Sequence, residues 1–439
     1  MDLYKPSLAV IGTGIAGLSA AWLLKNKFDV TVFESQPRAG MGVHTVDYSS
    51  RGIDTRIDIP LRIFCRGYYD HLMALYDHVG VIILASDHAG AFADGDGRLI
   101  FHYGNLGKGR ASVSYLKGGS VFSVRAWRIA VQNQRFLKRA KRDLAKRRDL
   151  AELTLGDYLQ QAQTGKLFVN TVLLPMLSVT CTCDYQSVLD YPADIMLGYL
   201  TCGVREFGIL SAANGVDDIV PRLLQGVHLK TNSPIETIQP EGEQVRVTVA
   251  GGEVSALFDH VVVASQAQQA ARMLSGFDRE KQLLEAVPFE ASYMSVHTDE
   301  AMLPESIAPL SPVTYIIPDG GERSEVSVDL TKAIRRFQGQ QRVFQTWNPV
   351  RDPAPEKELA RIKFTRPVVT RESRAAMYDL QKLQQKTDNR LWFCGSYVTA
   401  DKIPLLDAAV DSSVVLAERL GVEIPWLKSK DKDSGKGAA

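Results

Sequence analysis

A glycine-rich turn near the N-terminus is the feature of this 439-residue chain that could most clearly do chemistry. Its sequence is Gly12-Thr13-Gly14-Ile15-Ala16-Gly17, and Glu34 follows 20 residues after Gly14. The first two glycines allow a tight turn and a close approach of the backbone to a pyrophosphate, and the third lets a helix pack closely on a strand. A carboxylate at Glu34 accepts hydrogen bonds from ribose hydroxyls and disfavours a 2′-phosphate. The spacing therefore predicts a dinucleotide site that does not take NADP.

The elements around this turn have the order that such a site requires. Residues 7–12 form a short apolar run typical of a strand buried in a parallel sheet, and residues 17–24 have a helical composition. Residues 29–34 predict a second strand, which completes one βαβ unit. The start of the helix would direct unpaired N–H groups at the phosphates. This context favours a ligand-binding turn over a glycine turn that binds nothing.

Strand patterns recur later in the chain. They lie at residues 227–230, 244–249, 259–265 and 390–395, with a strand-rich region over 284–350. The buried strand at 259–265 is predicted to rejoin the first sheet, and residues 408–420 predict a helix.

A strongly basic segment spans residues 125–148. It carries ten Arg or Lys residues and one acid, Asp143, and its apolar residues recur at helical spacing. We therefore expect an amphipathic helix, and the capping pattern at Thr154 predicts that another helix starts there. The basic face could contact an anionic membrane or attract an acidic substrate. The pattern favours the simpler interpretation, a solvated surface face.

Composition excludes several classes of protein. The net charge of +1 does not indicate a nucleic-acid binder, and no apolar run approaches the roughly 20 residues that span a bilayer. The first residues lack the pattern of a secretory signal. The five cysteines include no C-x-x-C pair, so we expect reduced thiols, no metal site and a cytoplasmic protein. The oligomeric state stays open.

The stretch after Glu34 carries a family resemblance. Residues 34–46 resemble the E-x-x-x-R-x-G-G segment of the amine oxidase and phytoene desaturase branch of the glutathione-reductase-like FAD superfamily. Within this branch the chain is most similar to the amine oxidase-like group described as predicted NAD/FAD-binding proteins. The similarity runs through nearly the whole chain and includes residues 58–64, 189–193, 296–299, 346–349 and 393–397.

This resemblance implies FAD as the cofactor and a set of residues around it. Ile235 corresponds to a strand that meets the adenine, Ala264 and Ser265 to a strand end over the adenosine, and residues 407–409 to a helix start facing the flavin. The implied cofactor-binding residues are Gly12, Gly14, Ile15, Ala16, Gly17, Glu34, Ser35, Arg38, Gly40, Met41, Gly42, Ile235, Ala264, Ser265, Gly395, Ser396, Asp407, Ala408 and Ala409.

The chain departs from the family pattern on the flavin side. Met41 replaces the second glycine of the G-G pair, and Ala408 replaces the glycine after the acid. No catalytic base stands out. Arg62 could orient a substrate carboxylate or pair with Asp58, and Tyr397 could form a wall of the substrate pocket or serve packing.

The expected fold is α/β, with a discontinuous Rossmann-like FAD-binding domain and a mixed-sheet α+β substrate domain. The FAD domain is predicted at 1–75, 215–285 and 385–425, the substrate domain at 76–214 and 286–384, and a disordered tail at 428–439. The expected function is an FAD-dependent oxidoreductase that takes hydride from a C–N or C–C bond of a largely apolar small molecule. Two alternatives remain: a flavin-containing isomerase or cyclase without net oxidation, and a non-catalytic flavin-binding redox sensor.

Overall fold

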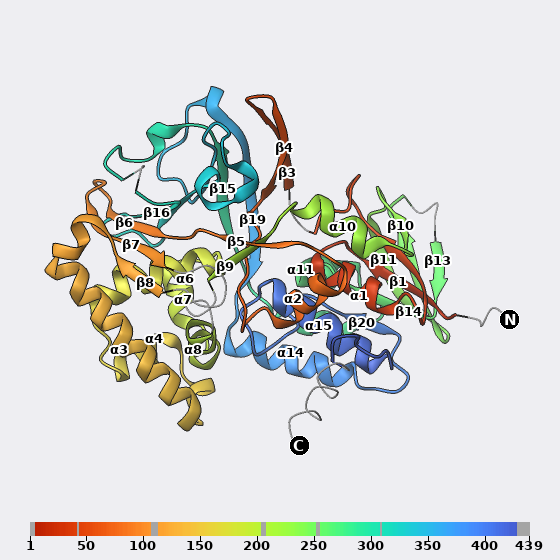
Figure 1. The fold of residues 1–439 in the computed structure, drawn as a ribbon. Helices are drawn as coiled ribbons and strands as arrows, with labels where there is room; N and C mark the ends of the chain where they lie inside the picture. Colours follow the sequence, from red (N-terminus) through yellow and green to blue (C-terminus); the bar gives the residue numbers. More distant parts are fainter. Residues whose placement is uncertain are drawn as a thin grey trace, which may run out of the picture.

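The computed structural model describes residues 5–41, 44–106, 113–202, 208–251, 255–307 and 310–427. Two lobes lie side by side (Figure 1). One is built around a five-stranded parallel sheet, and the other around an eight-stranded mixed sheet. The tail predicted to be disordered, residues 428–439, lies outside the described residues.

The five-stranded sheet gathers segments that are far apart in sequence. Its order is β10 (His228–Lys230), β2 (Asp29–Phe33), β1 (Ser7–Ile11), β14 (His260–Val263) and β20 (Leu391–Phe393), all parallel. The central strands are nearly all apolar because helices cover both faces. The predicted βαβ unit and the return of the strand at 260–263 to the first sheet are confirmed.

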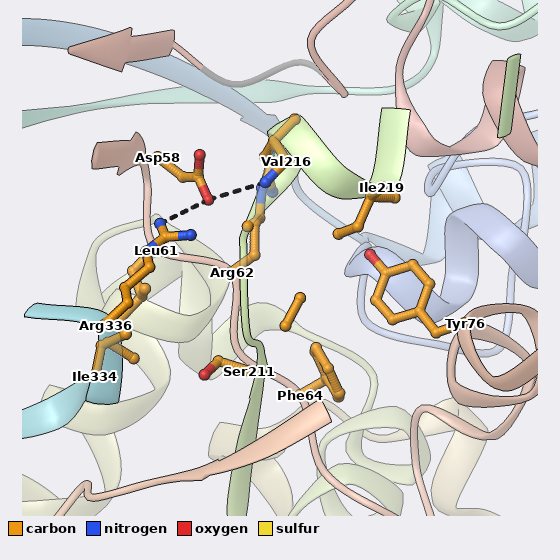
Figure 2. Close-up of a pocket in the computed structure, with 12 residues that line it drawn as sticks. Asp58, Leu61, Arg62, Phe64, Tyr76, Ser211, Val216, Ile219, Ile334 and Arg336 are labelled. Carbon is orange, nitrogen blue, oxygen red and sulfur yellow. Dashed lines mark hydrogen bonds and ion pairs between the residues drawn. The ribbon is translucent and has the colours of Figure 1, made fainter. Parts of the chain in front are cut away.

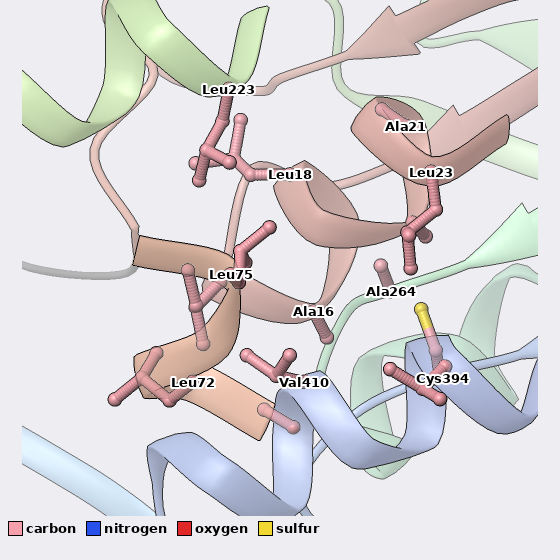
Figure 3. Close-up of a cluster of buried hydrophobic side chains, with 14 of the residues drawn as sticks. Ala16, Leu18, Ala21, Leu23, Leu72, Leu75, Leu223, Ala264, Cys394 and Val410 are labelled. Carbon is pink, nitrogen blue, oxygen red and sulfur yellow. The ribbon is translucent and has the colours of Figure 1, made fainter. Parts of the chain in front are cut away.

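Four helices cover one face of this sheet. They are α1 (Ile15–Leu24), α2 (Asp70–His78), α10 (Val216–Leu224) and α15 (Leu406–Arg419). Leu18, Leu72, Leu223 and Val410 come from these four helices and meet in one buried cluster (Figure 3). Since the cluster joins all four helices, it fixes where the starts of α1 and α15 lie relative to the strand ends.

The other face packs against α11 (Ala267–Met273), α12 (Asp278–Glu285) and α14 (Arg371–Leu383). A small antiparallel sheet of β11 (Ile235–Glu241), β12 (Gln244–Val249) and β13 (Ser255–Phe258) joins the same core. The predicted strand at 244–249 is therefore present, but in this second sheet.

The second lobe is organised by the eight-stranded sheet. Its order is β19 (Glu358–Pro367), β15 (Phe289–His297), β18 (Phe344–Trp347), β17 (Glu325–Asp329), β16 (Val313–Ile317), β6 (Gly90–Asp94), β7 (Leu99–Leu106) and β8 (Val113–Leu116). β16 and β6 are parallel and the other pairs antiparallel, so the sheet is mixed. The strand-rich region predicted at 284–350 supplies half of it.

Helices α3 (Val124–Lys146), α4 (Leu155–Gln161), α6 (Leu174–Cys181), α7 (Tyr185–Asp190) and α8 (Ala193–Thr201) share one core at the edge of this lobe. The basic segment is thus the predicted helix, within two residues at each end. Thr154 caps α4 through a capping box with Asp157, as predicted. Within the described parts of the chain, no helix is both long and apolar enough to cross a membrane.

Two small antiparallel sheets lie between the lobes: the hairpin of β3 (His44–Ser50) with β4 (Ile53–Ile59), and the pair of β5 (Ile83–Ser86) with the distant β9 (Ile209–Ala212). Residues 60–64 follow β4, and Phe64 pairs its backbone with Leu210 of β9 at 2.8 and 3.0 Å. The segment that carries Arg62 is therefore held where the two lobes meet.

Candidate functional site

The glycine turn joins β1 to α1 at the carboxyl edge of the parallel sheet. Gly12 has φ +107°, and a Cβ there would lie 3.2 Å from the carbonyl oxygen of Ala264. A Cβ on Gly17 would collide with the Gly12 carbonyl. These two glycines are therefore required by the packing of the chain itself. Gly14 differs, because among the residues that the structure describes its Cβ would meet only the Ala264 oxygen, at 3.9 Å. Space in front of Gly14 is left for a ligand.

The start of α1 faces that space without a cap. Gly14 is the N-cap residue, and no side chain accepts a hydrogen bond from the first-turn amides. Ile15, Ala16 and Gly17 are all buried. A buried helix start needs an acceptor for these amides, and an anion meets the positive end of the helix dipole as well. The geometry fits a phosphate group.

Glu34 is fixed beside the turn. One carboxylate oxygen accepts from the backbone N–H of Thr13 at 3.1 Å and also from the Thr13 hydroxyl. The other accepts from the backbone N–H of Gln36 at 2.9 Å and from the Ser35 hydroxyl at 3.2 Å. The carboxylate is thus held at the end of β2, next to the first-turn amides of α1. Sequence reasoning missed Thr13, although a hydroxyl residue between the two glycines was the available signal.

Two more predicted contact segments converge here. Ser233 donates its backbone N–H to the Glu34 carbonyl at 2.9 Å, which places Ile235 on the Glu34 side of the sheet edge. Ala264 donates to the Ile11 carbonyl at 2.9 Å, and the Ser265 amide nitrogen lies 3.6 Å from where a Gly12 Cβ would be. The Ser265 hydroxyl is buried, and it has no hydrogen-bond partner among the described residues.

The remaining predicted residues of the E-x-x-x-R-x-G-G segment lie at or near the surface. Ser35 and Arg38 are exposed and Gly40 is half-buried. Gly42 lies outside the described residues.

Met41 takes the backbone shape of the glycine it replaces. Its φ is +53°, its side chain is 2% exposed, and its backbone pairs with Gly14. Its carbonyl accepts from Arg62 Nη2 at 3.2 Å. The turn at this position is therefore conserved in conformation while the space that a glycine leaves open is filled by a side chain.

The C-terminal motif packs against the start of α1. The Gly395 N–H donates to Ser412 Oγ at 2.9 Å, and Ser413 Oγ donates to the Ala16 carbonyl at 2.8 Å. α15 also starts without a side-chain cap. Ser396, just past β20, is half-buried. The middle of α15 thus packs against the first turn of α1 and against the residues just past β20.

Asp407, in the first turn of α15, is fully buried and its carboxylate is already engaged. It accepts from the Leu72 N–H at 3.0 Å and pairs with Lys402 Nζ at 2.9 Å. Ala408 and Ala409 are also buried. Only backbone groups of this helix start are available to a ligand.

Tyr397 lies in the hydrophobic core beside β20, together with Val263, Ala267 and Phe393. Its ring lies 2.8 Å from the position of a Cβ on Gly395. Burial raises the pKa of its hydroxyl. These contacts favour a packing role for Tyr397.

A small cavity lies between the lobes beside residues 58–64 (Figure 2). Its volume of about 10 Å³ is roughly that of one water molecule. Asp58 accepts from the Val216 N–H at the start of α10 (3.2 Å) and pairs with Arg336 at 3.0 Å. Gly215 has φ +67°, and a Cβ there would collide with both of these charged side chains. Asp58 therefore ties β4 to α10 and to the second lobe.

The charge of a second arginine, Arg366, acts on Arg62, and sequence reasoning missed this residue. Burial, and next the like charge of Arg366, lower the pKa of Arg62 to about 10. Arg366 on β19 donates to the Thr180 carbonyl at 3.2 Å and lies 5.9 Å from the Trp347 ring. Burial also lowers the pKa of Arg366. Two half-buried arginines, one on each side of the junction, thus lie within reach of each other's charge. No local sequence pattern around residue 366 predicts that Arg366 lies near Arg62.

Aromatic side chains lie near these arginines. Tyr68 and Tyr199 meet edge to face with centroids 5.0 Å apart, and the Tyr68 hydroxyl accepts from the Ile403 N–H at 3.1 Å. Phe64 stacks at an angle on Tyr69 and Tyr76. In the part of the chain that the structure describes, no three metal-binding side chains gather.

Comparison with known proteins agrees with this architecture. A family model described as an NAD(P)-binding Rossmann-like domain matches residues 10–79. Putrescine oxidase in complex with putrescine superposes with a TM-score of 0.64 at 13% identity, over 96% of this chain and 100% of that one. The chain has the fold of the amine oxidases.

The same fold is shared by further enzymes. A cyclohexylamine oxidase from Brevibacterium oxydans gives a TM-score of 0.60 at 14% identity, over 95% and 100% of the two chains. A CLA-producing fatty acid isomerase from P. acnes gives 0.67 at 14% identity, over 94% and 98%. No curated protein sequence matches the chain. The predicted α/β fold class with a Rossmann-like domain is confirmed, and at these identities the likeness to the amine oxidases concerns the fold alone.

Proposed function

We propose that this chain is an FAD-dependent oxidoreductase that takes hydride from a C–N or C–C bond of a largely apolar small molecule. The observation that carries the proposal is the uncapped, buried start of α1 beside the open face of Gly14, with the Glu34 carboxylate fixed next to it. Helix-start amides suit a pyrophosphate, and the carboxylate suits ribose hydroxyls.

The residues present fit FAD on two further counts. The buried Ser265 hydroxyl beside Gly12 lacks a partner among the described residues, which is the state expected of a group that hydrogen-bonds a ligand. A second helix without a side-chain cap, α15, packs its middle against the first turn of α1 through Ser413. Residues 12–17, Glu34, Ala264 and Ser265 would hold the adenosine diphosphate half, and the start of α15 the flavin half. When bound, the flavin supplies the hydride acceptor.

The chain itself would bind and orient the substrate. The Tyr68 and Tyr199 rings, which meet edge to face, would offer the substrate apolar surface and keep water from it. Arg62 and Arg366 would set the electrostatic potential there, since two half-buried guanidinium groups stabilise negative charge nearby. Hydride transfer needs no protein base, which is consistent with the lack of an obvious one.

An isomerase without net oxidation is the second candidate. It is supported by the fold shared with a fatty acid isomerase and by Met41 in place of the glycine on the flavin side. Anaerobic mixing with substrate separates the two. Lasting bleaching of the flavin supports the oxidoreductase, and turnover with the flavin left oxidised supports the isomerase.

The cofactor is tested by the visible spectrum and a binding titration. We expect a yellow protein, and we expect Glu34→Ala to weaken FAD binding at least about tenfold, because charge-assisted hydrogen bonds are lost. Glu243→Ala, an exposed carboxylate in the β11–β12 turn, is the matched control and should bind FAD as the parent does. A colourless protein that takes up no added FAD would overturn the proposal.

A further inference from the structure

The start of α3 carries a cluster of exposed apolar side chains, which we call the apolar tip. It consists of Val121 and Phe122 from the preceding 3₁₀ turn (Gly118–Phe122) and of Val124, Trp127 and Val131 from α3. Phe122 is 90% exposed, Val124 75% and Trp127 53%. Large apolar side chains that gather at a surface mark an interaction site, whereas single ones are common.

The tip is held in this exposed position. Ser123 caps α3 by accepting from the Ala126 N–H at 3.2 Å, and Trp127 Nε1 donates to the Val121 carbonyl at 2.8 Å. The opposite face of α3 is anchored by Ala126, Ile129, Phe136 and Ala140, which are all buried in the core of the lobe. The helix therefore cannot roll to bury the tip without losing that core.

Basic residues continue the same face of the helix. At about 100° per residue, Arg128, Val131, Arg135 and Lys138 lie within roughly 40° of Val124 around the helix axis. These three basic side chains are exposed. The outer face of α3 thus runs from an apolar start into a cationic continuation.

No acid of the helix opposes this charge. Asp143 is the single acidic residue between positions 125 and 148. It is buried, where it pairs with Arg139 (3.4 Å) and Arg142 (3.0 Å) and accepts from the Tyr158 hydroxyl (3.1 Å). The negative charge of Asp143 is therefore neutralised in the interior, and the outer face of α3 keeps its positive charge.

We infer that the outer face of α3 docks on an anionic lipid surface, with the apolar tip in the headgroup region and the basic residues over the lipid phosphates. A helix that lies in the interface combines these two faces, and an indole ring prefers that depth. A purely solvated face would account for the charges but not for the tip. A second copy docked through the same face would bring like charges together.

The position of α3 is compatible with this docking. α3 lies at the outer edge of the second lobe, on the far side of the molecule from β1 and α1 (Figure 1). A protein docked through α3 keeps the glycine turn and the helix starts of the proposed cofactor site away from the lipid. The inference does not depend on the proposed function.

The test is co-sedimentation of the full chain with vesicles of phosphatidylcholine alone or mixed with phosphatidylserine. We expect binding to the mixed vesicles that falls as salt is added, and a blue shift of the Trp127 fluorescence. Phe122→Ser with Val124→Ser should weaken binding at least about tenfold, because apolar area no longer leaves water. Arg128→Glu with Arg135→Glu should weaken it further, since each basic residue near such a surface contributes about fivefold.

Matched controls lie on other surfaces. Ile82→Ser with Val350→Ser removes two comparably exposed apolar side chains, and Arg272→Glu with Lys386→Glu reverses two exposed charges on the Rossmann lobe. Both controls should bind as the parent does. Equal loss in the controls, or no sedimentation with phosphatidylserine vesicles, would overturn the inference. A dimer in light scattering that the Phe122 and Val124 substitutions dissociate would assign the face to a second copy instead.

Discussion

At Met41, the strain of the backbone opposes the stabilisation that comes from the buried side chain. A φ of +53° is a conformation that favours glycine, and a non-glycine residue there carries roughly 1–3 kcal/mol of strain. Its buried side chain packs in the core that α1 shares with Phe64 and Cys65, and removing a buried methionine side chain costs about 2–5 kcal/mol. The packing therefore outweighs the strain, which explains how the chain tolerates the lost glycine.

We predict that Met41→Gly lowers the free energy of unfolding by about 1–3 kcal/mol, although it restores the family residue and relieves the strain. Urea denaturation followed by tryptophan fluorescence measures the change. Arg51→Asn is the control, because Arg51 has the same left-handed φ of +52° on an exposed turn with no buried side chain to lose. It should change the stability by less than about 1 kcal/mol. A stabilised Met41→Gly protein would show that strain dominates.

The eight-stranded sheet carries a buried polar chain across three strands. His297 at the end of β15 is fully buried, with Nε2 2.8 Å from Thr346 Oγ1 on β18, which in turn contacts Ser327 Oγ on β17 at 2.8 Å. The Asp299 N–H donates to His297 Nδ1 at 3.2 Å. Since an amide can only donate, Nδ1 accepts and the imidazole carries its proton on Nε2. Protonating Nδ1 would break this contact.

This arrangement makes the second lobe sensitive to acid. Burial lowers the pKa of His297 to about 4, whereas an unfolded chain takes up the proton near pH 6.5. Because the folded pKa is the lower one, the stabilisation is complete above pH 6.5 and is lost as the pH falls towards 4. Its size is about 3 kcal/mol, since one pKa unit corresponds to 1.36 kcal/mol.

We predict that His297→Gln unfolds with a shallower loss of stability between pH 7 and pH 4.5 than the parent. Urea titrations at several pH values measure this slope. Asp299 does not contribute to the slope between pH 7 and pH 4.5. Its pKa is lowered to about 2, chiefly because its carboxylate accepts a hydrogen bond from the Ala354 N–H. Parallel slopes for the parent and His297→Gln would contradict the prediction.

At the scale of the molecule, the proposed cofactor site belongs to no single segment. The strands that meet at the sheet edge come from residues 7–33, 228–230, 260–263 and 391–393. A ligand held across them would bind the folded state and not the unfolded chain. Binding then stabilises the whole parallel sheet through linkage.

We predict that FAD at 100 times its dissociation constant adds about 2.7 kcal/mol to the free energy of unfolding of this lobe. The melting temperature of the stripped protein should therefore rise by several degrees in differential scanning fluorimetry. NADP⁺ should give no shift, because Glu34 repels a 2′-phosphate. Equal shifts with both nucleotides would contradict the assignment of Glu34.

Local features of the fold could be predicted from the sequence alone. The βαβ turn, the capping box at Thr154 and the basic helix depend on glycine φ angles, caps and periodicity, which act within one or two turns of chain. The family resemblance added the positions of Ala264 and Gly395. Boundaries were accurate to about two residues because strand and helix ends coincide with these local signals.

Only the tertiary structure decided which distant groups meet. Asp58 pairs with Arg336, which lies 278 residues away, and the charge of Arg366 acts on Arg62 from the other lobe. The Ser265 hydroxyl lacks a partner among the described residues because of how β14 packs beside Gly12. Whether an apolar side chain such as Phe122 is exposed likewise depends on what the rest of the chain places over it. Partners and burial depend on long-range packing, and no local pattern encodes them.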